Sequence, residues 1–145
     1  MTREYFLELT AEKSEIFGRT FALASKEGKD SKKFVEAVMT EESMSDLVNI
    51  DEDQRWCDEY MLLSRLEDKR EKPFEKGETI DQYVMWFLGY LYKYWMRIYN
   101  LDAKSVYEIL PFDRYLIMYD YYHTQDWDKV IYDATESYKE GNYIV

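Results

Sequence analysis

The sequence predicts an all-α protein in which residues 1–145 form a single domain of six or seven helices. Apolar side chains recur every three or four positions in most segments, as on one face of a helix. Glycine and proline number only five and two, whereas a β-sandwich or barrel needs turn residues about every 8–12 positions. Hydrophobic residues make up 46% of the chain and aromatic residues 18%, which is enough to build one packed core.

Three helices and a short additional helical segment are expected in the first half of the chain. The first covers about residues 10–28, with Thr10 as N-cap and Gly28 as its end. Ser31 is the expected cap of a short second helix, and residues 41–50 add a turn or two. The next helix is predicted over residues 51–70, where Asp51 and Gln54 resemble a capping pair. A loop with Pro73 and Gly77 follows.

The most informative segment is an aromatic-rich helix expected over about residues 79–100, with Thr79 and Gln82 as a capping box. Two apolar stripes cover it: Val84, Phe87, Leu88, Leu91, Trp95 and Ile98 on one side, and Tyr83, Trp86, Tyr90 and Tyr94 beside them. A helix that is apolar all round belongs at the centre of a bundle. Gly89 inside this helix costs about 1 kcal/mol of helix propensity relative to alanine, which indicates a close helix crossing there.

Three shorter helices are expected after residue 101. The first ends at Pro111 and the second runs over residues 112–123. Thr124 is the expected cap of the last helix, and Gly141 its end. His123, the only histidine, therefore stands at the corner between two helices, where an imidazole can donate to the free carbonyls of the preceding helix.

Charge is concentrated in one segment of this acidic chain, whose net charge is −11. Residues 41–68 hold ten acids and only two bases. Such a field repels phosphate backbones, so we expect no direct nucleic-acid binding, and it attracts a basic protein. The predicted partner-binding residues are Asp51, Glu52, Asp53, Asp58 and Glu59, together with His123 at the corner. The alternative is that these acids form only a solvated face that keeps the protein in solution.

The inventory of reactive residues is poor. A single cysteine, Cys57, excludes an internal disulfide and favours a reducing, cytoplasmic location. One histidine and one cysteine give no zinc or haem set, and we expect no metal, cofactor or catalytic residue. The longest uncharged stretch of the most apolar region, residues 82–92, is well short of the roughly 20 residues that a membrane span needs.

A resemblance covers about the last 60 residues, in which the matching residues are Trp86, Gly89, Tyr90, Tyr92, Tyr94, Trp95, Ser105, Tyr119, His123 and Thr124. In these residues the chain resembles small helical bacterial proteins encoded beside toxin genes, some of them next to ADP-ribosyltransferase-like toxins, and regarded as antitoxins. A weaker likeness covers residues 21–39, whereas Trp127 and Lys129 depart from the pattern expected after the His-Thr pair. The resemblance implies binding to a protein and brings no catalytic residues.

These observations together predict a non-enzymatic protein–protein interaction module, an antitoxin-like inhibitor of a basic partner, which the resemblance suggests is a toxin. One alternative is a phage-type inhibitor that mimics nucleic acid with its carboxylates and blocks a DNA- or RNA-binding protein. The other is an enzyme that uses His123 with a nearby carboxylate such as Asp120 or Asp126. Homo-oligomerisation stays open.

Overall fold

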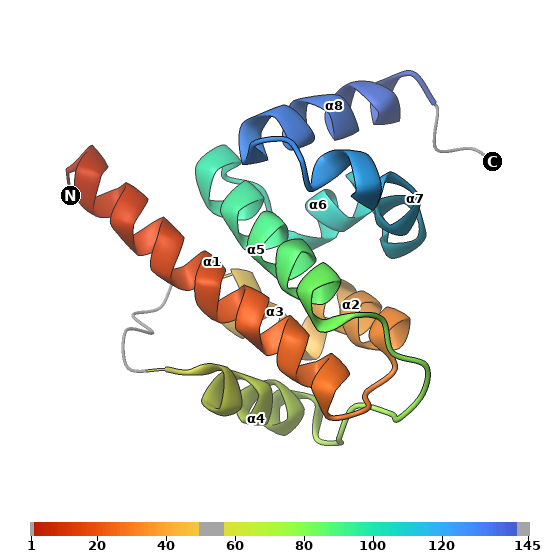
Figure 1. Ribbon diagram of the computed structural model, residues 1–145. Helices are drawn as coiled ribbons and strands as arrows, with labels where there is room; N and C mark the ends of the chain where they lie inside the picture. Colours follow the sequence, from red (N-terminus) through yellow and green to blue (C-terminus); the bar gives the residue numbers. More distant parts are fainter. Residues whose placement is uncertain (1, 50–56, 142–145) are drawn as a thin grey trace.

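The computed structural model describes residues 2–49 and 57–141, and it confirms the predicted all-α fold (Figure 1). This part of the chain contains eight α-helices, one 3-10 helix and no strand. The elements are α1 Arg3–Lys26, α2 Ser31–Thr40, the 3-10 helix Glu42–Met44, α3 Ser45–Asn49, α4 Glu59–Arg70, α5 Gln82–Tyr99, α6 Ala103–Ile109, α7 Phe112–Tyr122 and α8 Trp127–Lys139. The count exceeds six or seven because residues 42–49, expected as a turn or two, form two separate elements.

Aspartates begin most of the helices, which moves several expected N-caps. The side chains of Asp30, Asp58, Asp81, Asp102 and Asp126 each accept a hydrogen bond from a backbone amide of the first turn, at 2.8–3.2 Å. Asp30, Asp81 and Asp126 replace the predicted caps Ser31, Thr79 and Thr124. A carboxylate accepts the hydrogen bond of the backbone amide and also interacts favourably with the positive end of the helix.

The first helix is longer than predicted. It begins at Arg3 with Thr2 as cap, so the expected cap Thr10 lies inside it, where its hydroxyl donates to the Phe6 carbonyl at 2.8 Å. Thr10 is buried and also accepts from Arg97 Nε on α5 at 2.8 Å. Helix α4 is shorter than predicted, because Asp58 has an extended backbone and the helix begins at Glu59. The expected cap at Asp51 lies outside the described residues.

The most extensive contact in the molecule joins α1 and α5, which run side by side in opposite directions (Figure 1). They approach at Gly18 and Gly89, where a β-carbon on Gly89 would lie 2.7 Å from the Phe17 carbonyl oxygen. The close crossing predicted at Gly89 is therefore confirmed. Helices α4 and α2 also pack on α1, while α6 and α8 pack on α5.

Helix α5 is not buried on every side. Its first stripe enters the core, with Phe87, Leu88, Leu91 and Trp95 at most 4% exposed. The second stripe faces outward: Tyr83 is 56% exposed, and Trp86, Tyr90 and Tyr94 are half-buried. The expectation of a helix surrounded by protein is thus not confirmed, since tyrosine hydroxyls are best placed where they reach water.

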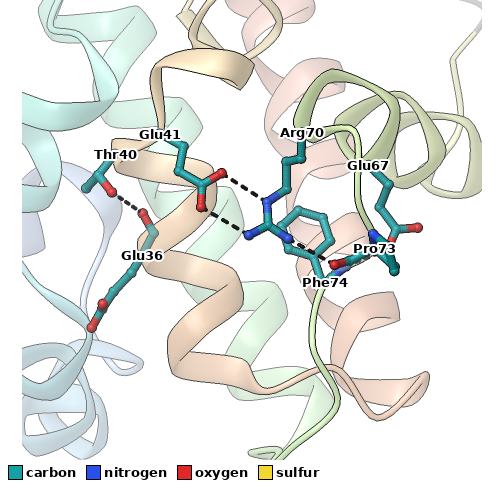
Figure 2. Close-up of polar contacts among 7 residues, drawn as sticks. All are labelled: Glu36, Thr40, Glu41, Glu67, Arg70, Pro73 and Phe74. Atoms are coloured by element: carbon teal, nitrogen blue, oxygen red, sulfur yellow. Dashed lines mark hydrogen bonds and ion pairs between the residues drawn. The ribbon is translucent and has the colours of Figure 1, made fainter.

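A polar cluster joins the loop after α4 to α2 and α4 (Figure 2). Arg70 donates from Nε and Nη2 to the two carboxylate oxygens of Glu41, at 3.0 and 3.1 Å, and from Nη1 to the Pro73 carbonyl at 3.2 Å. Its guanidinium lies 4.5 Å from the ring centroid of Phe74, the buried residue of the loop. Glu67 accepts from the Phe74 amide and from Lys29 Nζ. This cluster connects three elements and has a structural role.

Candidate partner-binding surface

The acidic residues expected to form the binding face are only partly described. Asp51, Glu52 and Asp53 lie outside the described residues. Asp58 is the N-cap of α4 and accepts from the Met61 amide at 2.9 Å, while Glu59 occupies the first position of the same helix. Both carboxylates thus stabilise the start of α4. The structure does not bring His123 into contact with either of them, because it lies at the end of α7.

Some acids of residues 41–68 form ion pairs in the fold with bases that lie outside this segment. Of its acids, Glu41 pairs with Arg70, Glu42 with Lys104 and Glu67 with Lys29. All three pairs join different elements of the fold, and such pairs reduce the field that the segment presents to a partner. Of the described carboxylates in residues 41–49 and 57–68, these three are therefore paired within the fold.

His123 occupies the predicted corner. Its Nδ1 lies 3.0 Å from the carbonyl oxygen of Tyr119, to which it donates, and its backbone amide donates to the same oxygen at 2.9 Å. The imidazole also stacks on the Tyr119 ring, with centroids 4.9 Å apart. Asp126 caps α8 through the Lys129 amide, and in the described part of the chain no hydrogen bond links His123 to a nucleophile or a carboxylate. The contacts are those of a helix C-cap.

His123 is also one end of a group of neighbouring rings on α5, α7 and α8, which we call the aromatic surface. It consists of Tyr83, Trp86, Tyr90, Tyr94, Tyr99, Tyr119, His123 and Trp127. All of these side chains are exposed or half-buried. The rings follow one another from Tyr83 to Trp86 at 5.6 Å, to Tyr90 at 5.3 Å and to Trp127 at 4.6 Å. Buried Phe87 lies beneath and contacts both Trp127 and Tyr119, which completes the path to His123.

Carboxylates surround the aromatic surface. Glu15 accepts from the indole Nε1 of Trp86 at 3.2 Å, and its other oxygen pairs with Arg19. Asp128 accepts from the hydroxyls of Tyr94 and Tyr99, at 2.9–3.1 Å. Burial raises the pKa of Tyr119, and the charges of nearby Asp81 and Asp120 raise it further. The edge of the surface is therefore acidic.

The hydroxyls of Tyr90, Tyr94, Tyr99 and Tyr119 stay neutral around pH 7, because the pKa of each is raised. Burial, and then the charge of Asp128, raise the pKa of Tyr94 to about 12. Burial and the hydrogen bond to Asp128 raise the pKa of Tyr99, and burial and Glu15 raise that of Tyr90. A neutral hydroxyl donates a hydrogen bond, so the negative charge of this face comes from its carboxylates alone.

Three other features were sought in the described residues: a metal site, a reactive thiol and a membrane-spanning helix. Residues 2–49 and 57–141 contain no group of three or more His, Cys, Asp or Glu side chains that could hold a metal ion. Cys57 is buried, and burial raises the pKa of its thiol, which disfavours the reactive thiolate. Within the same residues, no helix combines the length and the apolar character needed to cross a membrane.

Sequence reasoning identified five of these eight residues: it named His123 as a partner-binding residue and placed the other four on a helix expected at the centre of the bundle. The stripe of Tyr83, Trp86, Tyr90 and Tyr94 was visible at helical spacing, and its high tyrosine content was the signal that it reaches water. Trp127 had no such signal. Its place against the rings of α5 depends on how α8 packs on α5, a contact between residues distant in the sequence.

Comparisons with family models, curated proteins and solved structures give no match for this chain.

Proposed function

We propose that this protein is a non-enzymatic binding module that covers a basic protein partner with its aromatic surface, as an antitoxin-like inhibitor does. The observation that carries the proposal is a group of eight accessible rings on three helices, with carboxylates at its edge. Tyrosine and tryptophan are the residues that most often supply binding energy at protein interfaces. A net charge of −11 would also speed the encounter with a positively charged protein.

The nucleic-acid mimic and the enzyme receive less support from the geometry. Mimicry needs carboxylates displayed in rows, but five aspartates cap helices and further acids pair with lysine or arginine. An enzyme would need His123 to contact a reactive group, and its Nδ1 is already used by a backbone carbonyl. Asp51, Glu52 and Asp53 remain predicted contributors outside the described residues.

Tyr83 gives the direct test, because Tyr60 on α4 provides a matched control. The two side chains are 56% and 58% exposed, and only Tyr83 belongs to the aromatic surface. The tagged full-length chain would be used to capture partners, which are identified by mass spectrometry and purified for binding measurements. We expect a basic partner whose affinity falls about tenfold or more with Tyr83→Ala, as for an interface hot spot, and changes less than twofold with Tyr60→Ala.

Inhibition is tested in the same system by expressing the captured partner alone and with each variant. We expect wild type and Tyr60→Ala to relieve the growth defect that the partner causes, and Tyr83→Ala to relieve it less. Equal affinity of the two variants, or a captured protein that is acidic, would reject the proposal.

His123→Ala separates the corner role from catalysis. Loss of the Nδ1 bond to the Tyr119 carbonyl is expected to cost about 0.5–1 kcal/mol of unfolding free energy, the range for one exposed hydrogen bond near a helix end. His123→Asn, which keeps a donor for the carbonyl, should recover most of it. Urea unfolding measures both variants, and equal stability of wild type and His123→Ala would contradict the capping role.

A further inference from the structure

Asp128 is held in an unusual position within the aromatic surface. It lies in the first turn of α8 next to Trp127, and its side chain is exposed. Its Oδ1 accepts from the Tyr94 hydroxyl at 3.1 Å and from the Tyr99 hydroxyl at 2.9 Å, and its Oδ2 lies 3.1 Å from the same Tyr94 hydroxyl. Two side chains of α5 therefore fix the orientation of one carboxylate on α8.

No positive side chain of the described residues neutralises this carboxylate. Among residues 2–49 and 57–141, no lysine or arginine forms an ion pair with Asp128, whereas Asp133 on the same helix pairs with Lys129 and Asp113 with Lys32. Hydrogen bonds from two neutral hydroxyls leave the full negative charge in place.

Two tyrosine hydroxyls contact this carboxylate, and a tryptophan ring lies next to one of those tyrosines. Tyr94 and Tyr99 reach it with their hydroxyls, and the Trp127 ring centroid lies 6.3 Å from that of Tyr94. A fixed carboxylate close to aromatic rings can bind an organic cation, through the ion pair and through attraction to the rings. Arginine fits it better than lysine, because a planar guanidinium stacks on rings and donates in parallel to two carboxylate oxygens.

We infer that Asp128, positioned by Tyr94 and Tyr99, is the site that receives an arginine side chain of the protein partner. This inference rests on the proposed function and specifies the chemistry of the same surface. It makes Asp128 a specificity-determining residue, and Tyr94 and Tyr99 positioning residues that act through it.

The test uses the full chain and two capped hexapeptides, one of arginine and one of lysine, with binding followed by tryptophan fluorescence at 150 mM salt. Asp128→Asn keeps the size and the acceptor oxygen but removes the charge. Asp68→Asn is the control, because it removes one exposed charge from α4, away from the aromatic surface. We expect Asp128→Asn to weaken binding of the arginine peptide about tenfold and Asp68→Asn less than twofold, since only the first removes a specific pair.

Two further measurements make the result specific. The double variant Tyr94→Phe and Tyr99→Phe keeps the Asp128 charge but removes the two hydroxyls that orient the carboxylate. We expect it to weaken binding of the arginine peptide less than Asp128→Asn does. The lysine peptide should bind more weakly than the arginine peptide and lose less affinity with Asp128→Asn. Equal effects of Asp128→Asn and Asp68→Asn, equal binding of the two peptides, or no binding to wild type would overturn the site. If Tyr83→Ala still weakens binding of the captured partner in that case, the proposed function stands without the arginine site at Asp128.

Discussion

Gly89→Leu is expected to destabilise the protein by about 3 kcal/mol or more, at the upper end of the cost of overpacking. A β-carbon at this position would already lie 2.7 Å from the Phe17 carbonyl oxygen, 2.8 Å from the Phe21 ring and 3.0 Å from the Gly18 α-carbon. Two of these three neighbours are backbone atoms of α1, which cannot turn aside as a side chain can. The only relief is to separate α1 from α5, the most extensive contact of the fold.

Gly89→Ala gives the sharper form of the same test. Alanine would gain about 1 kcal/mol of helix propensity, yet we expect a net loss of about 1–2 kcal/mol because its methyl group meets the α1 backbone. Urea unfolding measures both variants, with Ala11→Leu, an enlargement at an exposed position of α1, as the control that should stay within about 0.5 kcal/mol. A Gly89→Ala protein more stable than wild type would show that the two helices do not touch there.

Local signals explain which parts of the fold could be predicted. Apolar spacing located the helices, and Gly89 located the crossing, because a glycine inside a strongly apolar helix weakens that helix and is typical of a close approach by another backbone. The cap positions were wrong by one or two residues at Ser31, Thr79 and Thr124. In each case an aspartate next to the predicted cap, or close to it, competed for the same amides.

The candidate site was harder to predict, since it depends on contacts between distant segments. Charge counting pointed to residues 41–68, but it gave no information on pairs such as Glu41 with Arg70, whose partners lie 29 residues apart. The carboxylate that carries the further inference, Asp128, looked like any other acid of the last helix. Only the packing of α8 on α5 brings Tyr94 and Tyr99 to it.

Glu41→Ala is expected to destabilise the fold by about 2 kcal/mol, because it leaves the Arg70 guanidinium in a nearly dry site without its carboxylate. The Arg70 side chain is only 8% exposed and that of Glu41 36%, so water reaches one side of the pair and keeps the loss below that of a fully buried one. Arg70 would still donate to the Pro73 carbonyl and lie over the Phe74 ring (Figure 2).

Arg70→Lys is expected to cost about as much as Glu41→Ala, although it keeps the charge. Lysine cannot donate to both oxygens of Glu41 and to the Pro73 carbonyl in one plane, and its ammonium cannot stack on Phe74 as the guanidinium does. Arg70→Met removes the positive charge instead. The Glu41 carboxylate then loses its partner, but it is half-exposed and water can solvate it.

A double-mutant cycle of Glu41→Gln with Arg70→Met isolates the pair. We expect a coupling free energy of about 1–2 kcal/mol from urea unfolding, since the two side chains share two direct hydrogen bonds. The exposed pair of Lys33 with Glu75 is the matched control, and the cycle of Lys33→Met with Glu75→Gln should show no measurable coupling. Coupling as small at Arg70 as at Lys33 would mean that the loop is held by the packing of Phe74 alone, and that the ion pair adds nothing to the attachment of α4 to α2.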